Sequence, residues 1–542
     1  MYKKIITFFS EGHRVRVVGI LCFIVLYVSA QTVMQNPPKA NDAPKKKIHM
    51  DTARILNKRL GFDPQILIDN VILSHDGIIM YCDSAYLDNN TNTFEAFSNI
   101  KVNQGDTLFM YGDYMHYDGN TMLLKVRNNV RLENGDVTLF TDSLNYDRVL
   151  NLGYYFDGGM LVDSLNELTS YWGQYEPSIK IATFSDSVKL VNNKFTLYSD
   201  TLKYGTDTKI ATILGPSTIV SDSGYIYTSR GWYNTQTEES MLLSRSLVVN
   251  KEGNQTLTGD SISYNRALGY GEVFGNMILH DTLKKVILRG HYGFYNELTD
   301  YAMATDSAWC IEYSQGDSLY LHGDTLKLQT DSIYREIKAY YGVRFYRTDI
   351  QGVCDSMQFN TKDSILYLYK SPVLWNERQQ LSGDTIEIFM NDSTVDMVHI
   401  KDYCFAIEDM DSIHFNQLKG RDLKAYFEGK EARYIIVSGN AESIFYPEEK
   451  DKSIMGMNQT ESSFLSINLR NRKIEKLKLW PKAIGKMTPL ADLHPEQTKL
   501  KDFQWYDYMR PLNKDDIFRK VSKKEEIERP PRISMDKFNN DW

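Results

Sequence analysis

Apolar and polar residues alternate along most of the chain, in short stretches that return at regular intervals. The clear stretches begin with Asp, often after Gly and usually before Ser or Thr, and continue with an apolar, a polar and an apolar residue. Asp113, for example, is followed at positions +2 and +4 by Met115 and Tyr117. Because successive side chains of a strand point to opposite faces, the alternation predicts strands with one buried and one wet face.

These stretches form a repeat when the Asp is taken as an anchor, with intervals of 29 to 33 residues and a final interval of 37. Seven copies are clear, with anchors at Asp113, Asp142, Asp200, Asp260, Asp324, Asp355 and Asp384. Five are weaker, with anchors at Asp83, Tyr171, Arg230, His291 and Arg421. A unit of about 30 residues cannot bury its apolar face alone, so the pattern predicts about twelve units stacked into one array.

In the clear copies the residues at +2 and +4 are apolar or aromatic, and the residue between them is polar. They are predicted to line a continuous apolar interior: Met115, Tyr117, Leu144, Tyr146, Leu202, Tyr204, Ile262, Tyr264, Leu326, Leu328, Met357, Phe359, Ile386 and Ile388. A fainter motif such as Ser98-Asn99-Ile100 follows each anchor by about 16 residues, so each unit has at least two strands. We interpret the Gly, Asn and Asp of both motifs as turn residues, because they tolerate positive φ or hydrogen-bond their own backbone.

The two ends of the chain differ from the repeats. Residues 1–30 contain four bases, one acid, an uncharged apolar stretch and a Val28-Ser29-Ala30 cleavage pattern, which indicates a secretory signal peptide. A linker is expected over 31–60, the repeats over 61–450 as one or several tandem domains, and an accessory, partly disordered segment over 451–542. Within that segment, Pro495 predicts a short helix that presents Leu500, Phe503 and Tyr506 and stops before Pro511.

Composition supports an all-β protein and excludes several kinds of site. The 542 residues include 36 Tyr, 24 Phe and 7 Trp but only 14 Pro, a balance typical of strands. The formal net charge of −8 argues against a nucleic-acid channel, which would need a basic stripe. After removal of the signal peptide four cysteines remain, Cys82, Cys310, Cys354 and Cys404, and their spacing predicts neither a metal site nor a disulfide scaffold.

The Gly-Asp-x-apolar-x-Tyr strand, the Asn-Val/Met-x-Leu strand half a unit later and the secretory signal resemble the OstA/LptA family of lipopolysaccharide-export proteins, over roughly residues 60–450. The resemblance implies an elongated half-open β-jellyroll, or β-taco, in the periplasm. Its apolar inner face, including the fourteen interior residues above, would shield the acyl chains of lipopolysaccharide or lipooligosaccharide on the way to the outer membrane. The implied partners are β-jellyroll modules of inner- and outer-membrane export proteins, or further copies of this chain, joined by pairing of strand edges.

Two alternatives stay open, a secreted β-solenoid that binds glycans and one that degrades polysaccharides. The block Gly316-Asp317-Ser318-Leu319 spells the nucleophile motif of the GDSL hydrolases, and Asp411 and His414 have the spacing of an acid/base pair. The same Gly-Asp-Ser/Thr-apolar block recurs at Gly105, Gly259, Gly323 and Gly383. We therefore interpret it as a turn of the repeat and expect a carrier, with no catalysis, cofactor or metal.

Overall fold

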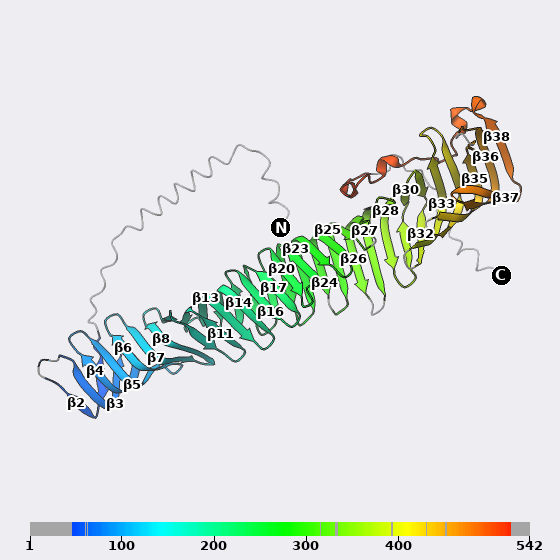
Figure 1. The fold of residues 1–542 in the computed structure, drawn as a ribbon. Helices are drawn as coiled ribbons and strands as arrows, with labels where there is room; N and C mark the ends of the chain where they lie inside the picture. The colour runs from blue at the N-terminus through cyan, green and yellow to red at the C-terminus, as the bar shows by residue number, and fades with distance from the viewer. Residues whose placement is uncertain are drawn as a thin grey trace, which may run out of the picture. The chain divides into compact units, whose positions relative to one another are not determined.

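The computed structural model describes residues 46–521, apart from Leu60, Phe62, Glu297, Gln315, 331–333, 392–393, Lys430 and 450–452. Antiparallel strands joined by short turns make up nearly all of it, so the predicted all-β class is confirmed (Figure 1). The chain forms two compact units, Met1–Val126 and Arg127–Trp542. The predicted signal peptide and the end of the accessory segment lie outside the described residues.

The first unit consists of long antiparallel strands that pair with their neighbours in the chain, preceded by two short strands that pair with the first long one. Its strands are β1 (His49–Thr52), β2 (Ile55–Asn57), β3 (Gln65–His75), β4 (Ile78–Asp88), β5 (Thr93–Gln104) and β6 (Leu108–Asp118). The boundary between the units falls inside β7 (Leu123–Asn134).

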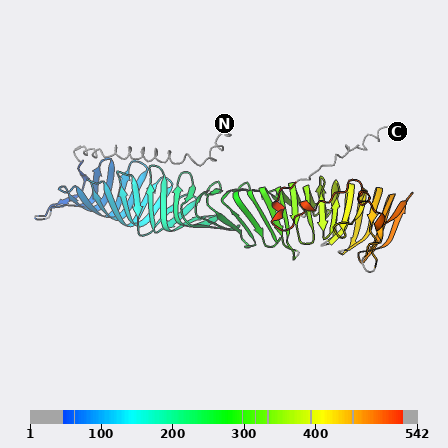
Figure 2. The same cartoon turned by 90° about the horizontal axis from the view of Figure 1, so that it is seen from above.

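In the second unit the strands again pair antiparallel, and Figure 2 shows them lying side by side. They run on beyond residue 450, where the accessory segment was expected to begin. These strands are β8 (Val137–Asp147), β9 (Leu152–Tyr155), β10 (Gly159–Val162), β11 (Asn166–Ser170), β12 (Trp172–Glu176), β13 (Ile181–Asn192), β14 (Phe195–Gly205), β15 (Ile210–Ile213), β16 (Ser217–Ser221), β17 (Gly224–Thr228), β18 (Gly231–Asn234), β19 (Glu239–Leu242), β20 (Ser246–Asn250), β21 (Gln255–Gly259), β22 (Ser261–Asn265), β23 (Tyr270–Asp281), β24 (Val286–Asn296), β25 (Tyr301–Glu312), β26 (Leu319–Thr330), β27 (Arg335–Tyr346), β28 (Gln351–Asn360), β29 (Ile365–Tyr369), β30 (Val373–Asn376), β31 (Gln379–Ser382), β32 (Thr385–Asn391), β33 (Thr394–Asp409), β34 (Phe415–Glu428), β35 (Glu431–Phe445), β36 (Gly456–Arg470), β37 (Lys473–Trp480) and β38 (Ile484–Pro489).

Each passage of the chain across the fold is bent near its middle, and several passages are broken there into two strands. At the bend the pairing register shifts, as between Ser185 and Val188 in β13. The anchors of the repeat lie at these bends: Asp200 is unpaired inside β14, and Asp260 separates β21 from β22. We expected the anchor to be a turn between strands, but it lies at the bend within a passage of the chain.

The second motif of the repeat lies at the same bend, on the adjacent strand. In β5, Ser98 and Asn99 have φ of 62° and 52° and bulge out of the pairing where Asp83 of β4 is unpaired. Nδ2 of Asn99 donates to Oδ2 of Asp83 at 2.7 Å, and Asn276 donates to Asp260 at the same distance. Residues that tolerate positive φ serve a β-bulge as well as a turn, which explains the wrong assignment.

The alternation places the apolar side chains on one common face, which forms the interior. Of the fourteen predicted interior residues, eleven are buried, and Tyr264, Leu328 and Phe359 are half-buried. The polar residue between two interior positions faces outward, as Lys203 does. The burial of this face follows from the sequence, while its use in lipid binding and the number of repeats stay predictions.

After β38 the chain turns back over the outer face of the second unit as a strap, residues 490–521. Leu500 and Tyr506 of the strap pack in apolar clusters with Phe405 and Trp375, whose neighbours Cys404 and Leu374 face the interior. Instead of the helix predicted from Pro495, the strap contains the short 3-10 helices η1 (Leu490–Asp492), η2 (Pro495–Gln497), η3 (Asp507–Met509) and η4 (Asp516–Phe518).

Side chains of the sheet hold the strap by its backbone, which removes the need for helical hydrogen bonds. Nε2 of Gln380 donates to the carbonyl oxygen of Gln504 at 2.8 Å, and Oε1 of Gln380 accepts from the backbone N–H of Tyr506 at 2.7 Å. Oε1 of Gln417 accepts from the backbone N–H of Leu500 at 2.9 Å. The strap follows the sheet because its polar backbone groups are satisfied there.

Candidate functional site

The hairpin turns of the second unit alternate between two lines, which we call rim A and rim B. Rim A contains turns such as 163–165 and 193–194, and rim B turns such as 206–209 and 235–238. Because every passage bends at its middle, its two halves form two layers with opposed apolar faces. The rims therefore face each other across a mouth, and side chains near the two rims are within hydrogen-bond distance of one another.

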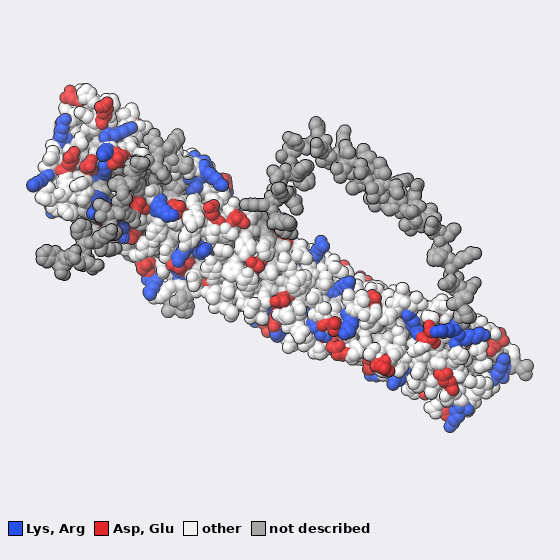
Figure 3. Space-filling model, turned by 180° about the vertical axis from the view of Figure 1, so that it is seen from behind, with Lys and Arg blue, Asp and Glu red and all other residues white. Residues whose placement is uncertain are grey.

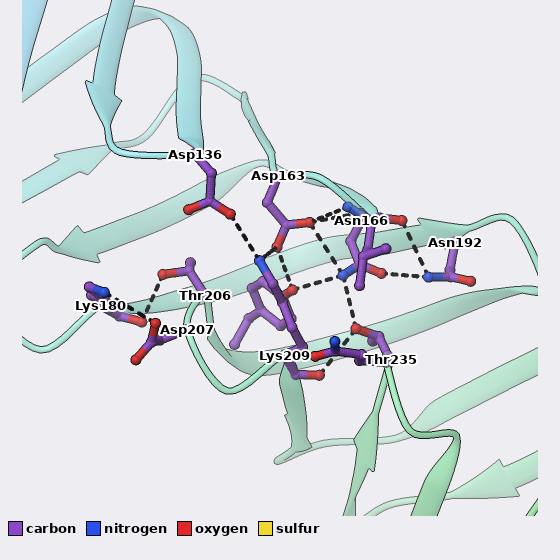
Figure 4. A network of polar contacts seen from close by, with 12 residues as sticks. Asp136, Asp163, Asn166, Lys180, Asn192, Thr206, Asp207, Lys209 and Thr235 are labelled. Atoms are coloured by element: carbon purple, nitrogen blue, oxygen red, sulfur yellow. Dashed lines mark hydrogen bonds and ion pairs between the residues drawn. The ribbon is translucent and has the colours of Figure 1, made fainter.

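Asp163 on rim A is the centre of a buried polar network that closes this mouth (Figure 4). Its Oδ2 accepts from Oη of Tyr204 at 2.6 Å and from Nζ of Lys209 at 2.9 Å, both of which come from the side of rim B. Its Oδ1 accepts from the backbone N–H groups of Leu165 and Asn166, each at 2.8 Å. The carboxylate is fully buried, yet each of its oxygens accepts at least two hydrogen bonds.

Asn166 carries the network further along the mouth. Its Nδ2 donates to Oη of Tyr204 at 2.7 Å and to Oγ1 of Thr235 on rim B at 2.9 Å. Its Oδ1 accepts from Nδ2 of Asn192 at 2.9 Å. We call these six residues the seam: Asp163, Asn166 and Asn192 from rim A, and Tyr204, Lys209 and Thr235 from rim B.

The charges of the seam stabilise each other. Burial raises the pKa of Asp163, but its hydrogen bonds from Tyr204, Lys209 and the backbone outweigh burial, so this pKa lies below its usual value. Burial lowers the pKa of Lys209, but its interactions with Asp163 outweigh burial and the net shift is upward. The pKa of Tyr204 is raised by burial and by its bond to Asp163. At neutral pH the seam therefore holds an ion pair with a neutral tyrosine as donor.

Other contacts extend the closure over residues 127–238, which we call the closed section. Nδ2 of Asn134 donates to Oη of Tyr175 at 3.0 Å, and the rings of Phe195 and Tyr233 meet with centroids 4.6 Å apart. Lys194 and Glu238 form an ion pair across the mouth. Five interior leucines of this section have no exposed surface: Leu161, Leu168, Leu190, Leu197 and Leu202. The interior here is filled by the chain's own side chains.

The interior differs over residues 239–480, which we call the open section. Side chains near the bend are buried, as Ile386 and Ile400 are, but apolar side chains nearer the rims are only half-buried. The half-buried interior residues include Val248, Leu257, Leu279, Leu288, Cys310, Leu319, Leu328, Ile337, Phe359, Leu366, Leu381 and Leu479. The result is a line of apolar side chains partly in contact with solvent, which we call the groove.

Between β24 and β27 several interior positions hold small residues. Gly293, Ala304, Ala308 and Ala339 occupy interior positions there and are fully or almost fully buried. Further along the chain an ion pair joins the rims, with Nη1 of Arg472 3.3 Å from Oε2 of Glu377. Both of its side chains are about two-thirds exposed, so this pair contributes little to closure.

The two sections differ in the residues at repeat position +4. In the closed section this position holds Tyr146 and Tyr204, which are fully buried, whereas in the open section Leu328 and Phe359 are half-buried and Ile388 is buried. A tyrosine hydroxyl can bond across the mouth, but a leucine or phenylalanine cannot. Tyr264, at the start of the open section, keeps the hydroxyl and is already half-buried. Sequence analysis treated these positions as equivalent and missed this difference.

The first unit is also closed, by its own N-terminal segment. The backbone N–H of Ile48 donates to Oδ1 of Asn92 at 3.0 Å, and the Ile48 side chain is buried. Nδ1 of His75 lies 2.7 Å from Oη of Tyr117, and Nε2 of the same ring lies 3.0 Å from the carbonyl oxygen of Lys46. The +4 tyrosine again takes part in the closure.

The suspected hydrolase blocks lie in different places. Ser318 ends the turn before β26, while Asp411 and His414 lie in the turn between β33 and β34, so β27–β32 separate them in the pairing order. Nδ1 of His414 contacts Oδ2 of Asp411 at 2.7 Å within that turn. Of the related glycines, Gly105 and Gly316 lie in hairpin turns. The others, Gly259, Gly323 and Gly383, lie at bends, so the interpretation as turns holds for only part of the set.

Potential metal ligands and thiols occur in the part of the chain that the structure describes. No group of three or more His, Cys, Asp or Glu side chains is placed there to hold a metal ion. Cys82, Cys310, Cys354 and Cys404 are free thiols. Burial raises the pKa of Cys82 and of Cys404 to about 12, so both are protonated at neutral pH and poorly nucleophilic.

The surface carries charges of both signs. On the face shown in Figure 3, Lys and Arg side chains are interspersed with Asp and Glu side chains. Within residues 46–521, no helix has the length and hydropathy needed to span a membrane.

Fold and geometry thus define a repeat protein with an apolar interior, closed in one section and accessible in another. Residues 45–200 match the sequence profile of a family described as OstA-like protein, so the resemblance to OstA/LptA proteins is confirmed for this part of the chain. The crystal structure of LptH, the LptA homologous periplasmic component of the lipopolysaccharide transport device from Pseudomonas aeruginosa, matches with 15% identity. That match covers 24% of this chain and 76% of LptH, with a TM-score of 0.13. No curated protein matches the chain at a significant level.

Proposed function

We propose that the protein is a periplasmic carrier that shields the acyl chains of lipopolysaccharide or lipooligosaccharide during transport to the outer membrane. The observation that carries this proposal is the groove of half-buried apolar side chains in the open section, from Val248 to Leu479. The OstA-like match of residues 45–200 favours this class of lipid over other acyl-chain ligands.

The groove is energetically suited to a mobile lipid. Keeping a methylene group out of water stabilises it by about 0.8 kcal/mol, so an acyl chain of about ten methylenes gains about 8 kcal/mol in an apolar groove. Because apolar residues such as Leu257, Leu319 and Leu381 recur along the groove, a chain can move along it without passing through water.

The proposal narrows the set of groove residues predicted from the sequence. Six of the fourteen pack as filled core, in the first unit or in the closed section: Met115, Tyr117, Leu144, Tyr146, Leu202 and Tyr204. The remaining eight would form the floor and walls of the lipid groove: Ile262, Tyr264, Leu326, Leu328, Met357, Phe359, Ile386 and Ile388.

Strand edges would join this carrier to its partners. The first strands β1 and β2 pair with β3, and the last strands β37 and β38 pair with β36. Edge strands offer unpaired N–H and C=O groups, so β-jellyroll modules of inner- and outer-membrane proteins, or a second copy of this chain, could add a strand there.

A photo-crosslinking residue at equivalent repeat positions tests the groove. We would replace Phe359 in the open section or Tyr204 in the closed section by benzoylphenylalanine, express each variant in cells that make lipopolysaccharide, and irradiate them. Crosslinks to lipopolysaccharide are expected at position 359 and not at 204, with circular dichroism to verify that both variants fold. Equal labelling at both positions, or none at 359, would contradict the proposal.

The hydrolase alternative makes the opposite prediction for Ser318. As a turn residue, Ser318 can be changed to Ala with a loss of stability of about 1 kcal/mol or less, and lipopolysaccharide should still reach the cell surface in a complemented depletion strain. Loss of a catalytic nucleophile would instead reduce a rate by several orders of magnitude. A null phenotype from a folded Ser318→Ala protein would restore the enzyme hypothesis.

The glycan-binding alternative has one observation in its favour. A shallow concavity of about 750 Å³ on the outer side of the closed section is lined by hydroxyl-bearing side chains, among them Tyr198, Tyr227, Thr169 and Thr218. Tyr198 and Tyr227 are nearly half exposed, as a sugar-stacking surface requires. If the protein binds soluble polysaccharide and the Tyr198→Ala variant does not, this second function is supported. If the unchanged protein does not bind polysaccharide, only the carrier function is retained.

A further inference from the structure

The segment that contains the last two strands, β37 and β38, is strongly basic although the chain as a whole carries a net charge of −8. Between residues 470 and 486 the only acidic residue is Glu475. Seven basic residues lie in the same stretch: Arg470, Arg472, Lys473, Lys476, Lys478, Lys482 and Lys486. We call residues 470–487 the terminal surface.

Lysines and apolar side chains share the outer face of this surface. In β37, Lys476, Lys478 and Trp480 pair with Asn468, Ser466 and Phe464 of β36, and the Trp480 ring stacks on Phe464 with centroids 5.5 Å apart. After the bend, Ile484 and Lys486 of β38 extend the same row. Ile484 is 68% exposed and Trp480 is 38% exposed.

Most of these charges have no internal partner. Arg470 pairs with Glu475 at 3.3 Å, and Arg472 pairs with Glu377. In the described part of the chain, Lys473, Lys476, Lys478, Lys482 and Lys486 have no carboxylate within 4.0 Å. The acidic residue Glu461 lies opposite Ile484 in the strand pairing. The terminal surface therefore presents uncompensated positive charge together with exposed apolar area.

We propose that the terminal surface binds an anionic phospholipid bilayer. Lysines near a negatively charged leaflet are attracted to the lipid phosphates, while Trp and Ile insert at the boundary between headgroups and acyl chains. Long lysine side chains keep their ammonium groups at the headgroups while their methylenes cover apolar surface. A partner that only adds a strand to the edge would use backbone groups and would not need this row of side chains.

This inference goes beyond the carrier function, but the two fit together. Leu477 and Leu479 lie on the opposite, interior side of β37, opposite Ile467 and Leu465 of β36. Leu477 is 43% exposed. The open end of the groove therefore lies beside the proposed membrane contact, where an acyl chain could pass between the bilayer and the interior without crossing water.

Vesicle flotation with the purified protein tests the proposal. The probes are vesicles of phosphatidylcholine alone and of phosphatidylcholine mixed with phosphatidylglycerol. The test variant is Lys476→Glu/Lys478→Glu, and the matched control is Lys189→Glu/Lys203→Glu, the same charge change on the exposed outer face of the closed section. A second test variant, Trp480→Ala, removes apolar area without a change in charge. Melting curves verify that all variants fold.

We expect the protein to bind the anionic vesicles only, and salt should weaken this binding. The charge-reversal variant should bind at least about tenfold more weakly, and the control variant should bind like the unchanged protein. Trp480→Ala should weaken binding severalfold. Equal binding of test and control variants, or no binding of the unchanged protein, would overturn the proposal. The proposal would also be overturned if the charge-reversal variant no longer captured a β-jellyroll partner but still bound vesicles as the unchanged protein does. Crosslinking of lipopolysaccharide at position 359 is measured separately, so a failure here is distinguishable from a failure of the carrier function.

Discussion

The closed and open sections of the second unit are built from the same repeat, yet one has a solid interior and the other an apolar groove. They share the bend, the anchor and the one-sided alternation. They differ at the rims, where the closed section places Asp163, Tyr204 and Lys209 within hydrogen-bond distance across the mouth. The open section has Leu328 and Phe359 where the hydroxyl would be. A few polar side chains at the rims thus distinguish a filled interior from a partly exposed one within a shared architecture.

The match to the OstA-like family covers only one of the two kinds of section. The OstA-like match ends at residue 200, within the closed section, and the accessible groove lies after residue 239. The part with the recognisable family pattern is therefore the part with a filled interior. In our proposal, the closed section is the scaffold and the open section holds the lipid.

The largest expected difference between the sections comes from a charge placed in each interior. Leu202→Asp buries a carboxylate without a partner, and the free energy of unfolding should fall by about 4 kcal/mol or more. Leu328→Asp, at a half-buried position, should cost about 1 to 2 kcal/mol and should also weaken crosslinking of lipid at position 359. Urea denaturation of both variants measures the free energy of unfolding. Equal losses of stability would show that the two interiors do not differ.

Breaking the seam should have the next largest effect. Asp163→Ala leaves the Lys209 ammonium buried without its main partner, so the free energy of unfolding should fall by about 3 kcal/mol or more. Asp136→Ala is the matched control, because Asp136 also contacts Lys209, at 3.3 Å, but is 64% exposed. Its loss should cost less than about 1 kcal/mol. Similar results for the two variants would argue against the seam as the element that holds the mouth closed.

The same ion pair predicts a pH dependence. The folded pKa of Asp163 lies below its usual value, so its stabilising contribution is complete above the unfolded pKa of about 3.9 and is lost as pH falls through the folded pKa. Lys209, whose folded pKa is raised, stays charged far above neutral pH. The difference in stability between the unchanged protein and Asp163→Asn should therefore be constant near neutral pH and shrink in acid. A difference that persists unchanged to low pH would contradict this.

The smallest of these effects should be confined to the strap. Gln380→Ala removes both hydrogen bonds that hold the strap at residues 504 and 506, and should cost about 2 kcal/mol. The neighbouring Gln379 makes one exposed contact at 3.4 Å to Glu408, so Gln379→Ala should cost only a few tenths of a kcal/mol. Limited proteolysis should then cut the strap of the Gln380 variant first. Unchanged protection would mean that apolar packing alone holds the strap on the open section.

Much of the fold was predictable because it depends on local patterns. Strand alternation decides which side chains are buried, and residues such as Ser98 and Asn99 mark where the backbone takes positive φ. The same residues could not show whether that φ serves a turn or a bulge, because both need it. The helix expected from Pro495 failed for a related reason, since side chains of distant strands satisfy the backbone of the strap.

By itself the sequence determined an all-β repeat protein with one apolar face, since these features depend on side-chain alternation and on motifs a few residues long. Only the tertiary structure decided where that face is filled and where it is accessible. Asp163 and Tyr204 are 41 residues apart in the chain, and Asn166 and Thr235 are 69 residues apart. Their meeting depends on the bend of every strand between them, because the bends determine which turns face each other across the mouth. That accumulated geometry is not present in any single repeat.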